Sequence, residues 1–410
     1  MRAFPDRTMP STKRWIGNLA AGLVALLAAS ALAAPDEAGY GASDGYPVGT
    51  RADWFQKRFL VGSLSAMDKI FPVRAVKAGA TARPLPAHEK PFDWSRIADY
   101  LASQPATGLL IVKDGKVLAE QFQYGRGKED RFTSFSMAKT LVGMAVGVAI
   151  ADGHIVSIDD PVDKYEPELA ASAWKGVSIR HVLTMTSGVK FDETYDTPNS
   201  DIARLSRPWT RGEGSLIGEL KKIVDREAAP GERFRYVSAN TQVLAQVLAK
   251  ATGPRLSAYV GERLWAPMGA EADATWVLDA AGMEAAYCCF SARLRDFARL
   301  GQLLMDDGVS DGKRLLPAGW VAAATTVHPP DGHLQPRRAT PYFGYGFQTW
   351  VFPERLGFAL LGVRGQAVFV HPSLKLIMVQ TAVWPRSRDP ELARARDEFW
   401  RELVARVQRM

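Results

Sequence analysis

Ser136 and Lys139 stand three residues apart, at the point where a long apolar segment begins. Residues at positions i and i+3 lie on one face of a helix, and the segment 140–150 is typical of a buried helix. Both side chains would then point at one cavity, with the serine hydroxyl as nucleophile and the lysine amine as its base. A helix N-terminus also offers unpaired N–H groups that favour an oxyanion. The spacing therefore predicts acyl-transfer chemistry.

The Ser-x-x-Lys pattern also occurs at Ser172 and Ser187, but neither serine opens a long helix, because a turn glycine lies close to each. The alternative for Ser136 is that it only caps a helix and that Lys139 is solvated. A Gly-x-Ser-x-Gly pattern at 308–312 is a rival nucleophile motif. It follows a helical segment rather than a strand, so it lacks the strand–turn–helix context that such a motif requires.

Lysine is a poor base at its ordinary pKa of about 10.4, so the chemistry requires burial or a neighbouring cation to lower the pKa of Lys139. The apolar helix makes burial plausible. Tyr236, which follows a Pro-Gly turn and a short run expected to be extended, could share the proton transfer. A tyrosine of this kind is more often a core residue with a hydrogen-bonded hydroxyl. The presence of Ser136 and Lys139 in the same chain favours the catalytic interpretation.

These motifs resemble those of the serine hydrolases with the class C β-lactamase fold, a family that includes D,D-peptidases, esterases and 6-aminohexanoate-dimer hydrolases. The first family motif, Ser-x-x-Lys, is matched by Ser136 and Lys139, and the second, Tyr-x-Asn/Ser, by Tyr236 and Ser238. The third motif departs, because relatives carry Lys-Thr-Gly or His-x-Gly where this chain has Leu-Leu-Gly at 360–362. The chain thus keeps the glycine of the third motif and loses its cation.

The segment after the third motif resembles the 6-aminohexanoate-dimer hydrolase branch. This resemblance implies an oxyanion hole made by the backbone N–H groups of Ser136 and Val363. It also implies that Tyr195, on a loop, faces the substrate, and that Ser238 and Gly362 belong to the substrate-binding site. The alternative for Tyr195 is an exposed loop residue without such a role.

The missing cation bears on the substrate, because β-lactams and D-alanyl peptides present a carboxylate that a lysine normally binds. Its loss favours an ester or a linear amide. Arg364 could replace the cation as a substrate-binding residue, or it could be a surface residue at a strand end. Two alternatives stay open: a β-lactamase or D-alanyl-D-alanine carboxypeptidase, and a catalytically silent binding relative. A pure binder would have no chemical reason to retain Ser136, Lys139 and Tyr236.

The resemblance implies an α+β fold of the β-lactamase/transpeptidase-like type, in which an antiparallel sheet flanked by helices packs beside a mostly helical lobe, with the active site between them. We expect a hydrolase domain at 86–410, its helical lobe at about 134–305, and an irregular N-terminal extension at 34–85. The chain should end in a helix from about Pro390. The predicted strands are a hairpin with an Asp-Gly turn at 109–120 and segments near 343–351, 357–361, 366–371 and 375–382.

The first 33 residues are typical of a signal peptide. Basic residues precede an apolar run from about Trp15 to Leu32, and Ala31-Leu32-Ala33 offers a small-residue cleavage site. We therefore expect a periplasmic or secreted enzyme. An uncleaved membrane anchor is the alternative, since the apolar run is nearly long enough to span a bilayer.

Composition narrows the range of partners. The formal net charge is +7, of which residues 1–33 contribute +3 through four basic residues and one acidic residue, leaving +4 for the rest. That charge is too mild to indicate nucleic-acid binding, and a small-molecule ester or amide is the expected partner. The six histidines show no metal-ligand spacing, so we expect no metal and no cofactor. The adjacent Cys288 and Cys289 are expected to be buried apolar filler and to close no long loop.

Overall fold

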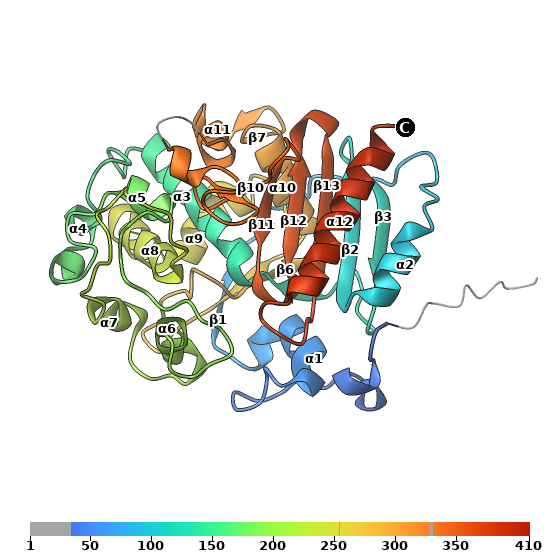
Figure 1. Ribbon diagram of the computed structural model, residues 1–410, viewed down its shortest axis with the longest axis horizontal. Helices are drawn as coiled ribbons and strands as arrows, with labels where there is room; N and C mark the ends of the chain where they lie inside the picture. Colours follow the sequence, from blue (N-terminus) through green and yellow to red (C-terminus); the bar gives the residue numbers. More distant parts are fainter. Residues whose placement is uncertain (1–33, 254, 328–330) are drawn as a thin grey trace, which may run out of the picture. The chain divides into compact units, whose positions relative to one another are not determined.

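A large antiparallel sheet has seven strands, in the order β3-β2-β13-β12-β11-β10-β9 (Figure 1). The structure is a computed structural model and describes residues 34–253, 255–327 and 331–410, so the predicted signal peptide at 1–33 lies outside the described residues. The strands of this sheet are β2 (Ala106–Lys113), β3 (Lys116–Phe122), β9 (Gly344–Tyr345), β10 (Trp350–Val351), β11 (Phe358–Leu361), β12 (Ala367–His371) and β13 (Leu376–Ala382).

The first two strands form the predicted hairpin. Asp114 and Gly115 have φ angles of 51° and 74°, as a two-residue turn with positive φ at both positions requires. Strand β2 is buried on both faces. Its side chains alternate between two cores: Leu110 packs with residues of α10 (Leu294–Met305), while Leu109 packs with residues of α2 (Arg96–Ser103) and α12 (Pro390–Val407). Helices therefore cover both faces of the sheet (Figure 1).

The helical part of the molecule is built around α3 (Ala138–Ala151) and α8 (Ser238–Thr252), which pack against each other. The apolar segment predicted as a buried helix forms α3, and Gly147 lets the helix approach a neighbour, since a Cβ there would lie 2.7 Å from the Trp320 ring. Trp320 belongs to α11 (Trp320–Thr325). The other helices of this part are α4 (Val162–Tyr165), α5 (Ile179–Leu183), α6 (Asp201–Thr210), α7 (Leu216–Lys221) and α9 (Leu256–Val260).

A second antiparallel sheet adds two strands to the region at 134–305, which was expected to be mostly helical. Its order is β1-β5-β6-β4, formed by β1 (Val73–Val76), β5 (Ala274–Val277), β6 (Phe290–Arg293) and β4 (Arg131–Thr133). Two of these strands lie inside the predicted helical region, and α10, which ends that region, packs on the large sheet instead. Strands of four residues are too short to show a clear alternation in sequence, and the partner of β5, strand β1, lies about 200 residues earlier in the chain.

The N-terminal extension is more regular than expected. It contains α1 (Leu60–Ser65) and β1 in addition to short helical turns, and it belongs to one compact unit with the rest of the described chain. Leu60 and Val61 are fully buried, and the hydroxyl of Tyr40 donates to the carbonyl of Val383 at 2.6 Å. No helix in the described ranges has the length and apolar character needed to cross a bilayer.

Short helical turns and one small hairpin complete the described structure. The turns before residue 72 are η1 (Ala38–Tyr40), η2 (Ala42–Asp44), η3 (Lys57–Phe59) and η4 (Met67–Lys69). Later turns are η5 (Phe135–Met137), η6 (Pro167–Ala171), η7 (Gly261–Trp265), η8 (Gly332–Leu334), η9 (Val363–Gly365) and η10 (Pro372–Leu374). The hairpin pairs β7 (Val309–Ser310) with β8 (Lys313–Arg314).

Candidate active site

Ser136 lies in the turn η5, two residues before α3 begins. The residue before it, Phe135, has a φ angle of 41°, a backbone conformation that non-glycine residues adopt rarely and that is concentrated at functional sites. Ser136 itself is half-buried. The sequence therefore placed Ser136 correctly at the entry to a buried helix, and the structure adds that a tight turn presents its hydroxyl.

Lys139 is buried directly behind Ser136, with 1% of its surface exposed. Its side-chain nitrogen donates to the Oγ of Ser136 at 2.9 Å and to the backbone carbonyl of Tyr287 at 2.8 Å. Burial lowers the pKa of Lys139 to about 7, and the negative charge of Glu193 opposes this shift. Near neutral pH a large fraction of Lys139 is therefore the free amine, which can accept a proton from a hydroxyl.

Tyr236 lies on the other side of the same pair, just before α8. Its ring centroid is 5.1 Å from the Lys139 nitrogen, and the ring stacks on Trp350 with centroids 5.2 Å apart. Burial and the charge of Glu193 raise the pKa of Tyr236, while a hydrogen bond with Ser136 opposes the rise. Tyr236 is thus a protonated phenol at neutral pH, placed to pass a proton to or from Ser136.

Strand β11 brings a second backbone donor to the nucleophile. It ends at Leu361, and a Cβ atom on the next residue, Gly362, would lie 2.4 Å from the carbonyl oxygen of Ser134, so only glycine allows this close approach. Val363 follows in the first position of η9. Within the described residues, the backbone hydrogen bonds include no acceptor for the N–H of Ser136 or of Val363. These two donors are therefore free to hold an oxyanion.

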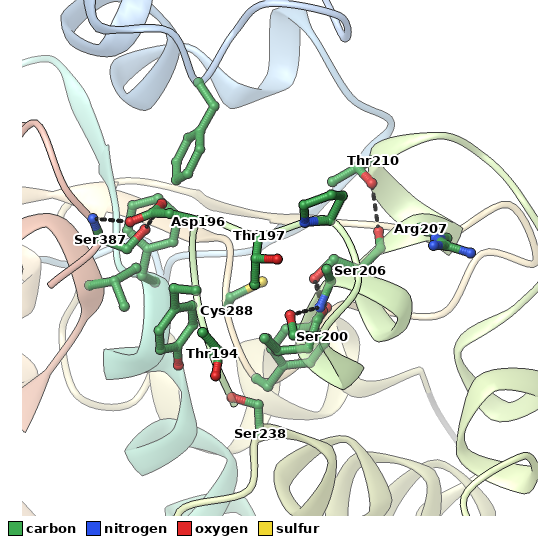
Figure 2. A pocket seen from close by; sticks show the side chains of 18 of the residues that line it. Thr194, Asp196, Thr197, Ser200, Ser206, Arg207, Thr210, Ser238, Cys288 and Ser387 are labelled. Atoms are coloured by element: carbon green, nitrogen blue, oxygen red, sulfur yellow. Dashed lines mark hydrogen bonds between the residues drawn. The ribbon is translucent and has the colours of Figure 1, made fainter. Parts of the chain in front are cut away.

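Two cavities meet at the nucleophile. The first has a volume of about 300 Å³ and lies toward α6 (Figure 2), and the second has a volume of about 460 Å³ and lies toward β10 and the start of α12. Four residues line both of them: Ser136, Tyr195, Val363 and Ser387. A substrate can therefore extend to either side of the Ser136 hydroxyl.

Glu193 joins two of the predicted residues, and the sequence analysis did not find it. One carboxylate oxygen accepts hydrogen bonds from the hydroxyls of Tyr195 and Ser238, and the other accepts from the backbone N–H of Ser238 at 2.8 Å. Tyr195 faces both cavities, whereas the Ser238 hydroxyl is engaged with Glu193. The only signal for Glu193 is its place two residues before Tyr195 in the same loop.

Arg364 is not placed as expected. It is 4% exposed, its Nη1 donates to the carbonyls of Trp384 at 2.8 Å and Pro385 at 2.9 Å, and its guanidinium lies 3.8 Å from the ring centroid of Phe55. It lines neither of the two cavities that contain Ser136. Both expectations for Arg364, substrate binding and surface exposure, are wrong, because backbone carbonyls and an aromatic ring engage its guanidinium inside the protein.

Cys288 and Cys289 are buried and close no long loop, but they are not two free thiols. Their sulfurs form a disulfide between neighbouring residues, which corrects the expectation of simple apolar filler. Cys288 also lines the first cavity (Figure 2). The pair directly follows Tyr287, whose backbone carbonyl holds Lys139.

The rival serines have no comparable surroundings. Ser172 is buried and donates to the carbonyl of Leu169 at 2.7 Å, Ser187 is also buried, and the lysines of their motifs are exposed. Ser310 lies in the β7–β8 hairpin rather than at a strand–helix turn. Within residues 34–253, 255–327 and 331–410, no group of three or more His, Cys, Asp and Glu side chains is arranged to hold a metal ion.

The chain matches the family described as Beta-lactamase over residues 95–401. The 6-aminohexanoate-dimer hydrolase of Paenarthrobacter ureafaciens is 32% identical over 290 residues, 69% of this chain and 73% of that protein. A β-lactamase of Escherichia coli K12 is 27% identical over 144 residues, 35% of this chain and 33% of that protein.

A solved structure from Bacillus anthracis, provisionally named a 6-aminohexanoate-dimer hydrolase, superposes with a TM-score of 0.77. The superposition covers 88% of this chain and 97% of that chain, at 21% identity. It confirms the predicted α+β fold of the β-lactamase/transpeptidase-like type. The family match and the relative from Paenarthrobacter confirm the resemblance to which the Ser-x-x-Lys and Tyr-x-Ser motifs pointed. The chain is a hydrolase that belongs to the Beta-lactamase family.

Proposed function

We propose that this protein is an exported serine hydrolase that cleaves an ester or a linear amide bond through an acyl-enzyme on Ser136. The observation that carries the proposal is the contact of 2.9 Å between the Ser136 hydroxyl and a buried lysine with a pKa of about 7. Such a lysine can serve as a general base at neutral pH, which an exposed lysine cannot.

In the first half-reaction, the Oγ of Ser136 attacks the substrate carbonyl carbon while its proton moves to the Lys139 nitrogen. The N–H groups of Ser136 and Val363 stabilise the negative charge on the carbonyl oxygen. Tyr236 then relays the proton to the departing alcohol or amine, whose bond to the carbonyl carbon breaks. In the second half-reaction, water attacks the acyl carbon and gives a proton to the same pair. The bond between the acyl carbon and the Oγ of Ser136 then breaks, the pair returns the proton to that Oγ, and the acid leaves.

The proposed substrate class rests on the absence of a cation in the third motif. Leu360 occupies the position of the motif cation, and its side chain is fully buried. An uncharged ester or amide needs no cation there, so this class suits the site best. The relative from Paenarthrobacter is named for hydrolysis of a 6-aminohexanoate dimer, which makes a linear amide a natural member of the panel to be tested.

A β-lactamase or D-alanyl-D-alanine carboxypeptidase is the second candidate, and one observation favours it. The guanidinium of Arg388 lies 4.9 Å from the ring centroid of Tyr195, and Arg388 lines the second cavity. A guanidinium there could meet a substrate carboxylate. Arg388 is exposed, however, and solvent screens the attraction of an exposed cation for a carboxylate.

Export is part of the proposal on the strength of the first 33 residues alone, with their basic start, apolar run and small-residue site. The periplasm or the medium is the proposed location. Mass spectrometry of the N-terminus after expression in a Gram-negative host tests it. A mature chain that starts at Ala34 is expected, and an intact N-terminus in the membrane fraction would favour the anchor instead.

The test of the activity is a parallel hydrolysis panel on the mature protein and its Ser136→Ala variant. The substrates are p-nitrophenyl acetate and butyrate, a 6-aminohexanoate dimer, nitrocefin and a D-alanyl-D-alanine peptide. We expect Ser136-dependent cleavage of the esters or the linear amide, and labelling of Ser136 by a fluorophosphonate probe. Turnover of nitrocefin or the D-alanyl peptide would favour the second candidate. A lack of both turnover and labelling would favour a silent binding relative.

A further inference from the structure

We infer that the N-terminal extension forms part of the active site, and that its aromatic side chains build an apolar subsite for an uncharged aliphatic or aryl group next to the scissile bond. The inference rests on the proposed function and adds the substrate group that the first cavity selects. Two residues of the extension, Trp54 and Phe55, line the 300 Å³ cavity together with Ser136.

The two residues join aromatic side chains from other elements into one wall. The Trp54 ring lies 5.9 Å from Trp209 of α6 and 5.3 Å from Phe71, and Phe71 lies 5.3 Å from Trp209. Phe55 lies 6.1 Å from Phe135, the residue that precedes the nucleophile. Edge-to-face contacts of this kind fix the rings relative to one another. The wall therefore spans the extension, α6 and the turn that presents Ser136.

The wall is held in place rather than loosely attached. The N–H of Trp54 donates to the carbonyl of Thr50 at 2.8 Å, and the N–H of Gly49 donates to the hydroxyl of Ser63 in the buried helix α1 at 3.0 Å. Phe55 stacks on the buried guanidinium of Arg364, next to the proposed oxyanion donor Val363. A preformed surface of this kind loses little conformational entropy on binding.

Several polar groups around the cavity form hydrogen bonds with one another. The hydroxyl of Tyr287 bonds to Ser206 at 2.9 Å and to the Trp209 indole N–H at 2.8 Å. The carboxylate of Asp196 accepts from the N–H and the hydroxyl of Ser387 at 3.0 and 2.7 Å (Figure 2).

The two cations that line this cavity, Arg207 and Arg211, come from α6 and its C-terminal end, and Figure 2 shows the Arg207 side chain directed away from its labelled neighbours. The surface near the nucleophile is therefore mainly carbon, which favours an uncharged apolar group.

The experiment compares two ester series, p-nitrophenyl esters from acetate to octanoate and alkyl acetates from methyl to octyl, so that either side of the ester can enter the cavity. In the wild-type protein, we expect kcat/KM in one series to rise about fourfold for each methylene group until the cavity is full, following the transfer free energy of a buried methylene. The Trp54→Ala variant should lower the ratio of kcat/KM for p-nitrophenyl hexanoate to that for p-nitrophenyl acetate, or for hexyl acetate to that for methyl acetate, at least tenfold.

A second variant fills the cavity from α6, in case Trp54→Ala disturbs the fold. Ala203 of α6 lines the cavity and is half-buried, so Ala203→Phe should fill the space and restrict turnover to the shortest esters. Phe59→Ala is the matched control, because Phe59 belongs to the extension, is half-buried and lines none of the cavities around Ser136.

An unchanged chain-length profile in both Trp54→Ala and Ala203→Phe would overturn the subsite. Failure of the proposed function is separate, because it would show as wild-type turnover of the shortest ester that does not depend on Ser136.

Discussion

The side-chain nitrogen of Lys139 lies 2.9 Å from the hydroxyl oxygen of Ser136, in a place from which solvent is almost excluded. Its other partner is a neutral backbone carbonyl, that of Tyr287. No carboxylate is hydrogen-bonded to Lys139 among the described residues; Glu193 acts only through its charge. The desolvation of an ammonium group is therefore poorly compensated, and this explains why a large fraction of Lys139 is the neutral amine near pH 7.

The first prediction concerns pH. Because the pKa of Lys139 is lowered to about 7, protonation below that pH removes the base, and activity should be present above it. The profile of kcat/KM for p-nitrophenyl acetate should rise with a midpoint near pH 7 and then level off, reporting the free enzyme. Stopped assays between pH 5 and 9.5 measure it, with rates corrected for spontaneous hydrolysis. A rate that still rises at pH 9.5 without levelling off would mean that the pKa of Lys139 is not lowered to about 7.

The second prediction concerns the size of the lysine's contribution. Lys139→Ala should lower kcat by about three orders of magnitude or more. The nucleophile and the base act as a unit, so the loss of either removes most of the rate enhancement that the pair provides. Lys175→Ala is the control, because Lys175 closes another Ser-x-x-Lys pattern and is exposed. Steady-state kinetics and a thermal melt of both variants separate lost chemistry from lost folding. Wild-type turnover in Lys139→Ala would refute the assignment.

The third prediction concerns Glu193, whose charge raises the pKa of Lys139 against the effect of burial. Removing this charge in Glu193→Gln should let the pKa of Lys139 fall further, so the rising limb of the pH profile should move to lower pH. Glu213→Gln removes a charge of the same sign from an exposed position and should leave the midpoint unchanged. If the two variants gave the same midpoint, the charge of Glu193 would have no influence on the base.

Much of the fold could be predicted because its signals are local. The Asp-Gly hairpin, the buried helix α3 and the C-terminal strands each show their pattern within one continuous segment. The second sheet could not be found in the same way. Its strands have three or four residues and pair over only two to four positions, with partners that come from distant parts of the chain. Their stability therefore comes from tertiary pairing rather than from local sequence.

The residues of the candidate site also differ in whether a local sequence pattern marks them. Ser136, Lys139 and Tyr236 carry recognisable spacings, and the structure brings them together. Glu193 and Trp54 reach the site from a loop and from the extension, where a single carboxylate or tryptophan has no pattern to distinguish it. For Arg364 the sequence predicted a role that the structure does not support. A cation beside a motif glycine suggested ligand binding, but its guanidinium donates hydrogen bonds to the carbonyls of Trp384 and Pro385.

The fourth prediction tests the link between Gly362 and the oxyanion hole. In Gly362→Ala the new methyl group would meet the carbonyl oxygen of Ser134 at 2.4 Å, a distance that forces the end of β11 away from the nucleophile turn. Val363 would then lose its place beside Ser136. Loss of one oxyanion donor lowers kcat by about 10² to 10³, so we expect a fall of this size in kcat with a smaller change in KM.

Gly127→Ala is the matched control, since no atom lies within 4 Å of the position that its Cβ would take and its φ angle is not positive. Its kcat and melting temperature should equal those of the wild type. If Gly362→Ala kept wild-type kcat and remained folded, the chain would have room to absorb the methyl group without moving Val363. The backbone of η9 would then not be a required part of the oxyanion hole, and the donor opposite Ser136 would have to come from another element.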